Sequence, residues 1–116
     1  MKLSQKHFAL FKAECKKNLE RMGLHGWRVY YEFKRLNDSF GRCQWKFEGR
    51  VATITLANDF PKPFSSLEEQ IKETALHECI ELLLSPISDL ATSRGFCQAE
   101  FDREVHAIIR TLEKLL

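Results

Sequence analysis

Three ionisable side chains that could act together lie close in the sequence, at His77, Glu78 and Glu81. In a helix, residues four positions apart lie about 40° from each other around the axis, so His77 and Glu81 would converge on one point. An imidazole nitrogen and a carboxylate oxygen are both good ligands for zinc. Glu78, about 100° from His77, would lie close enough to take a proton from metal-bound water. The pattern His-Glu-x-x-Glu therefore predicts a divalent metal site with Glu78 as general base.

The residues around this pattern are apolar or Cys from Ala75 onward, and they are distributed around the whole helix. Such a helix is expected to be buried on most sides. A carboxylate buried there without a partner would cost several kcal/mol, so the three groups need a compensating cation or a hydrogen-bond network. The alternative is an ordinary surface pair, which is what a His and a Glu four residues apart on a helix usually form.

A metal site needs at least one further protein ligand, and the last predicted helix offers Glu100, Asp102, Glu104 and His106. If its apolar face is centred near Val105 and Leu112, Glu104 lies roughly 80° from that centre and His106 about 120°. Glu104 is therefore the first choice for the third ligand and His106 the second. Glu104 as a flanking surface residue stays open as an alternative.

Composition predicts a single domain over residues 1–116. The chain has 116 residues, 44% of them hydrophobic and nine of them Phe, which is enough to bury a core. The net charge of +2 is too small to indicate a nucleic-acid partner by itself. Basic residues do gather between Lys12 and Arg28, where a solvated helix face is the simpler interpretation.

The cysteines and the hydropathy pattern indicate the cytoplasm. The N-terminal residues contain no long apolar run, and no segment approaches the roughly 20 apolar residues of a membrane span. The four cysteines form no CxxC pair, so reduced and mostly buried thiols are expected. Cys79 is expected in the core, and Cys97 is a remote candidate ligand.

The order of predicted elements is one helix, three strands and two more helices, which is an α+β class. Apolar residues at intervals of three and four predict a helix from about Ser4 to Met22, closed by Gly23 and Gly26. Alternating or β-branched residues predict three strands in an antiparallel meander. These strands cover Trp27 to Phe33, Arg42 to Phe47 and Val51 to Ala57.

Two further helices follow Pro61 and Pro63, which break the chain. Ser65 or Ser66 followed by Glu68 and Glu69 is typical of a capped helix start, and this long helix is expected to end at about Leu84 because Ser85-Pro86 follows. The apolar face that includes Val105 and Leu112 predicts a final helix from Gln98 to Leu116.

From Trp27 to the C-terminus the chain resembles the zincin metallopeptidases, in particular SprT-like domains and the short metallopeptidase-like proteins often encoded by phages and prophages. The resemblance rests on Gly41-Arg42-Cys43, on Ile54 to Ala57, on Ala75-Leu76-His77-Glu78 and on Glu104 to Arg110. It implies a zinc-dependent peptidase in which His77 is the first ligand, Glu78 the base and Glu104 or His106 the third ligand. Glu81 stands where the family has the second His of HExxH, and this carboxylate favours a harder metal such as Mn²⁺ and weakens the expectation of activity.

Two classes of function follow from these patterns. The first is a metal-dependent hydrolase, namely a peptidase acting on a peptide or protein substrate. The second is a catalytically inactive zincin-like binding module with a structural metal or none, in which His77 and Glu81 pair with each other or with Arg94 or Arg103. A weaker idea is association with nucleic acid, using Lys12, Lys16, Arg21 and Arg42.

Overall fold

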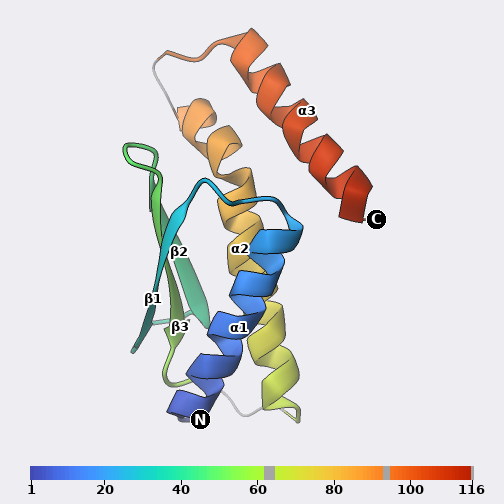
Figure 1. Ribbon diagram of the computed structural model, residues 1–116. Helices are drawn as coiled ribbons and strands as arrows, with labels where there is room; N and C mark the ends of the chain where they lie inside the picture. The colour runs from blue at the N-terminus through green and yellow to red at the C-terminus, as the bar shows by residue number, and fades with distance from the viewer. Residues whose placement is uncertain (62–64, 93–94, 116) are drawn as a thin grey trace.

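The computed structural model describes residues 1–61, 65–92 and 95–115, so Pro63, Arg94 and Leu116 lie outside the described residues. Along the chain, three strands follow one N-terminal helix and precede two C-terminal helices, which confirms the α+β class (Figure 1). The elements are α1 (Gln5–Arg21), β1 (Arg28–Lys34), β2 (Gly41–Lys46), β3 (Val51–Ala57), α2 (Leu67–Thr92) and α3 (Gln98–Leu115).

The sheet is mixed, and the predicted antiparallel meander is wrong in its order. The strand order is β1-β3-β2, with β3 parallel to β1 and antiparallel to β2. Hence β1 and β2 are not neighbours, and β3 inserts between them. The physical reason lies in burial, because Ala52, Ile54, Leu56 and Ala57 of β3 are almost fully buried and need a strand on each side.

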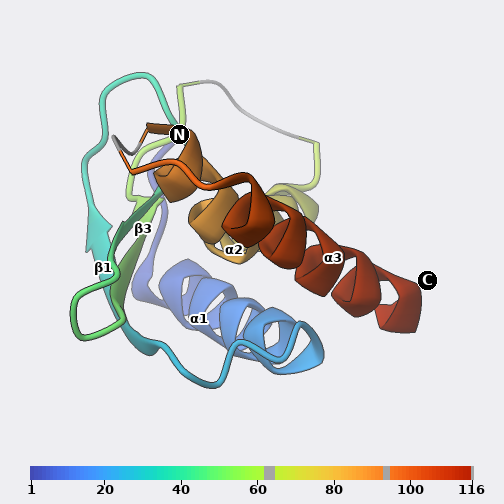
Figure 2. The same ribbon diagram turned by 90° about the horizontal axis from the view of Figure 1, so that it is seen from above.

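Helices α1 and α2 cover one face of this sheet, as the two views in Figures 1 and 2 show. Phe8 of α1 stacks on Phe33 of β1, with ring centroids 5.0 Å apart. Helix α2 packs beside α1 and over β2, so that Ile71, Ala75 and Cys79 join the same core as the strands. The edge strand β2 therefore lies directly against the helix that carries the predicted metal ligands.

Helix α1 ends as the sequence predicts. Gly23 has a φ of +71°, the left-handed conformation that a glycine adopts without strain. The backbone N–H of Gly23 donates to Glu20, and that of Leu24 donates to Leu19, which together form a Schellman motif. This turn directs the chain back towards β1.

Helix α2 does not end at Ser85-Pro86 but continues to Thr92, so that part of the prediction is wrong. A proline lacks the N–H that would bond to the carbonyl four residues earlier, which here belongs to Leu82. The buried Ser85 hydroxyl donates to that carbonyl instead, at 2.7 Å. Because the carbonyl keeps a partner, the helix passes through the proline. The start of α2 matches the prediction, since the Ser66 hydroxyl accepts from the Glu69 N–H at 3.4 Å.

Helix α3 runs back beside α2 (Figure 1), and its apolar residues Ile108 and Leu115 rest on the edge of the core. No described residue of α3 is fully buried. Within the described ranges, no helix is both long and apolar enough to cross a membrane.

Replacing Ser85 by Ala removes the donor to the Leu82 carbonyl. We expect Ser85→Ala to lower the free energy of unfolding by about 1–3 kcal/mol, the usual cost of leaving a buried polar group unpaired. Urea unfolding followed by circular dichroism measures this change. Thr92→Ala is the matched control, because the Thr92 hydroxyl donates to Ser88 at 3.2 Å on an exposed part of α2. It should change stability by no more than about 0.5 kcal/mol.

A Pro86→Ala background separates the hydroxyl's role from simple packing. The restored N–H at position 86 can donate to Leu82, so Ser85→Ala should cost less in this background than in the wild-type chain. Equal costs in both backgrounds would contradict the explanation given for the continuous helix.

Candidate metal site

His77, Glu78 and Glu81 form a group on α2 in which one ligand atom from each residue lies within 4.8 Å of the others. The convergence predicted for His77 and Glu81 is present, since His77 Nε2 lies 3.8 Å from Glu81 Oε1. Side chains four residues apart on a helix meet in this way. The group could hold a divalent cation.

The three side chains differ in their exposure to solvent. Those of His77 and Glu81 are 70% and 46% exposed, whereas Glu78 is only 5% exposed. The expectation that this helix is buried on most sides is therefore wrong, and Leu76 and Ile80 are exposed as well. The reason is that only the side of α2 towards α1 and the sheet is fully covered. The candidate site thus has a solvent side and a buried side.

Gly41, the first residue of β2, sets how deeply Glu78 is buried. A Cβ atom at Gly41 would lie 2.8 Å from Thr74 Cγ2, 3.1 Å from Glu78 Oε2 and 3.1 Å from the Thr55 carbonyl oxygen. Only a residue without a side chain allows β2 to approach α2 this closely. The strand therefore lies directly over the Glu78 carboxylate.

The buried carboxylate of Glu78 is not fully paired. Its Oε1 atom is inaccessible to solvent and has no hydrogen-bond partner among the described residues. Burial, together with the hydrogen bond that the protonated Glu78 carboxyl donates to Glu81 and the negative charge of Glu81, raises the pKa of Glu78 to about 8. Without a cation, the Glu78 carboxyl is therefore largely protonated at neutral pH. A cation at this position would favour its ionised form.

Cys43 lies on the same face of β2 as Gly41, two residues further along the strand. Burial, followed by the charges of Glu78 and Glu81, raises the pKa of Cys43 to about 12. Its thiol is thus neutral at physiological pH in the metal-free protein. Cys79 is buried in the core, as predicted, and donates to the Cys15 carbonyl at 3.6 Å.

A pocket of about 400 Å³ opens beside the group. Helix α2 contributes Gln70, Glu73 and Thr74 as well as His77 and Glu78, and the segment 38–41 closes the opposite wall. Analysis of the sequence missed this pocket. One residue of its lining was predictable from the sequence, because Glu73 lies four residues before His77 and so shares its helix face.

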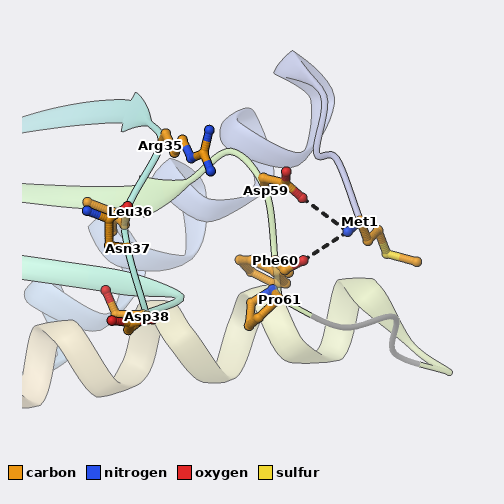
Figure 3. A pocket seen from close by; sticks show the side chains of 9 residues that line it. Met1, Arg35, Leu36, Asn37, Asp38, Asp59, Phe60 and Pro61 are labelled. Carbon is orange, nitrogen blue, oxygen red and sulfur yellow. Dashed lines mark hydrogen bonds and ion pairs between the residues drawn. The ribbon is translucent and has the colours of Figure 1, made fainter.

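A second pocket, of about 700 Å³, adjoins the first and shares Asp38 and Ser39 with it. Figure 3 shows the ammonium group of Met1 at its far end, 3.1 Å from Asp59 Oδ1 and 2.8 Å from the Phe60 carbonyl oxygen. Asp38 lies at the other end, beside α2 (Figure 3). None of the three candidate ligands lines this second pocket.

The structure does not bring the predicted third ligands from α3 to the group. Glu104 lines a pocket with Pro86 and Leu90, and Pro86 lies about 13 Å further along α2 than His77. His106 is exposed, and its Nδ1 lies 2.7 Å from the carbonyl oxygen of Asp102. Helix α3 therefore meets α2 beyond the candidate site. Arg103 lines the same pocket as Glu104, also away from the site.

No model of a known protein family, no curated protein and no solved structure matches the chain.

Substituting Gly41 tests the close approach of β2 to α2. We expect Gly41→Ala to lower the free energy of unfolding by about 1–3 kcal/mol, because the added methyl group overpacks the contact with Thr74. Gly26→Ala is the matched control, since a Cβ there meets no atom within 4 Å. Adding Thr74→Ser, which removes the contacting methyl group, should recover part of the loss. Equal effects of Gly41→Ala and Gly26→Ala in urea unfolding would contradict the packing described above.

The raised pKa of Glu78 predicts a pH dependence of stability in metal-free protein. Between its ordinary value of 4.5 and about 8, the folded state binds more protons than the unfolded state. Stability should therefore fall as the pH rises through this range, by at most about 1.4 kcal/mol per pH unit from this group. Unfolding in the presence of a chelator at pH 5, 6, 7 and 8 measures the slope, and Glu78→Gln should remove this contribution. Parallel curves for the two proteins would be the contrary result.

Proposed function

We propose that this protein is a metal-dependent hydrolase that cleaves peptide bonds. The observation that carries the proposal is the Glu78 carboxylate, which is buried and lies within reach of His77 and Glu81, and one oxygen of which has no hydrogen-bond partner among the described residues. A bound cation is the simplest compensation for such a group. The resemblance of the helix to SprT-like zincins supports a peptide bond as the substrate.

The donor set favours Zn²⁺ as the metal. His77 offers an imidazole nitrogen and Glu81 a carboxylate oxygen, and zinc accepts both kinds of ligand. Mn²⁺ is the second candidate, because Glu81 in place of an imidazole makes the donor set harder. The exposure of His77 and Glu81 leaves room for water or substrate on the solvent side.

Each residue has a distinct part in the proposed reaction. A divalent cation, when bound, polarises a carbonyl oxygen and makes water more acidic. His77 and Glu81 would hold it from the solvent side. Glu78 would accept a proton from water and return it to the leaving nitrogen, a role that suits a carboxylate whose proton affinity burial has raised. In the balanced reaction, the water oxygen joins the carbonyl carbon, the C–N bond breaks and the nitrogen gains the proton.

A non-catalytic binding module is the second candidate function. Its support is that α3 leaves Glu104 and His106 away from the group, so only α2 supplies ligands within the described residues. A metal held in this way would bind more weakly than one with a third protein ligand. A peptide or protein is the partner that we propose in this case, with nucleic acid as the weaker alternative.

Free thiols at all four cysteines support a reducing cytoplasm as the location.

Metal content tests the hydrolase proposal first. Protein purified without a chelator or a histidine tag should contain nearly one equivalent of zinc or manganese by elemental mass spectrometry. His77→Ala and Glu81→Gln should each lose most of it, because each removes a ligand from a small set. His25→Ala is the matched control, since His25 is exposed and lies outside the group. Glu104→Gln and His106→Ala test the third-ligand prediction and should retain the metal if α3 takes no part.

Peptidase activity provides the second step. Glu78→Gln should lower the rate of peptide hydrolysis at least about 100-fold while retaining metal, the usual loss when a general base is removed. Metal binding without measurable hydrolysis would support the binding module. Absence of both bound metal and a metal-dependent rise in melting temperature would contradict the proposal.

A further inference from the structure

The pocket beside the candidate metal site carries a marked charge imbalance. Its lining includes the acidic residues Asp38, Glu73 and Glu78, and His77 is the only other ionisable residue among the described residues there. No Lys or Arg is among the described residues that line it. A lining rich in carboxylates attracts positively charged groups into the space that it encloses.

The two outer carboxylates of this pocket have no partners in the described part of the chain. Asp38 and Glu73 are both exposed, and neither makes an ion pair or a side-chain hydrogen bond there. They lie on different elements, Asp38 in the loop before β2 and Glu73 on α2, so they face the pocket from separate walls. Both carboxylates are therefore free to pair with a bound cationic group.

Glu78, beside the proposed metal, also lines this space. It is only 5% exposed, its Oε1 has no hydrogen-bond partner in the described part of the chain, and its side chain is one of those that line the pocket. A buried polar atom of this kind calls for a ligand that brings positive charge or a hydrogen-bond donor. The volume of about 400 Å³ is large enough for one long side chain and its neighbouring backbone.

We infer that this pocket binds the cationic group of the substrate, an ammonium or a guanidinium, next to the bond to be cleaved. This inference rests on the proposed peptidase function for the position of that bond. The charge could come from a Lys or Arg side chain or from a free peptide amino terminus, and the pocket chemistry is the same for both. Peptides with an acidic residue at this position are repelled by the same wall.

Peptide binding tests the inference without relying on catalysis. The probes are four labelled tripeptide amides: blocked Ala-Lys-Ala, free-terminus Ala-Ala-Ala, blocked Ala-Ala-Ala and blocked Ala-Glu-Ala. Affinities are measured by fluorescence anisotropy at low salt, with the wild-type chain both loaded with zinc and treated with chelator. At least one of the two cationic peptides should bind more tightly than the neutral one, and the acidic peptide should bind most weakly. Which cationic peptide binds identifies the source of the charge.

Asp38→Asn and Glu73→Gln should each weaken binding of the cationic peptide by about two- to fivefold, as expected for loss of an exposed ion pair. The double variant should lose roughly tenfold if the two carboxylates act independently. Asn is chosen at position 38 because this residue has a φ of 63°, which Asn tolerates as well as Asp does. Glu113→Gln, an exposed substitution on α3, is the matched control and should leave the affinity unchanged.

The outcomes separate this inference from the proposed function. A preference for cationic peptides in protein that neither binds metal nor hydrolyses peptides would support the pocket and contradict the hydrolase. Metal binding and hydrolysis with equal affinity for all four peptides would support the hydrolase and contradict the inferred role of the pocket. Absence of measurable binding by any peptide, with or without zinc, overturns the inference, as does a preference that survives the double variant.

Discussion

The close approach of β2 to α2 at Gly41 is the constraint on which both packing and site chemistry depend. The strand comes so near that a single added carbon atom would touch Thr74, Glu78 and the backbone of β3. As a result, Glu78 is covered while His77 and Glu81, on the next part of the helix surface, stay in contact with solvent. The contact that completes the packing of the sheet on the helix thereby also buries the Glu78 carboxylate. A proton or a cation must neutralise its charge.

Local sequence patterns predicted the elements of this fold but not how they are joined. Periodicity located the helices and strands because each depends on neighbours within a few residues. Strand order depends on contacts between distant segments, and the short connection between β2 and β3 made a meander the simplest interpretation. One signal for the true order was present. The segment Val51–Ala57 has no charged residue, whereas β1 and β2 each carry charges on one face, as edge strands do. The helix end expected at Pro86 was wrong because the neighbouring Ser85 hydroxyl supplies a local substitute for the missing donor.

In the candidate site, too, local sequence predicted one part of the arrangement and not the rest. His77 and Glu81 converge because their spacing on one helix dictates it, so this pair was predictable. The position of α3 along α2 depends on which parts of two apolar faces meet, and no pattern within either helix encodes that position. Glu104 consequently lies by Pro86 and not by His77. The pocket wall formed by segment 38–41 could not be predicted from local sequence either, because it depends on the packing of β2 on α2.

If the group holds a metal, as proposed, the exposure of His77 determines how fast that metal exchanges. An ion held mainly by side chains on the solvent side can enter and leave without any segment of the chain unfolding, so exchange with small chelators such as glutathione should be fast. Occupancy would then follow the free concentration of the metal from moment to moment and would not be fixed when the chain folds. A centre of this kind responds to changes in metal supply, whereas a fully enclosed centre keeps the first ion that it captures.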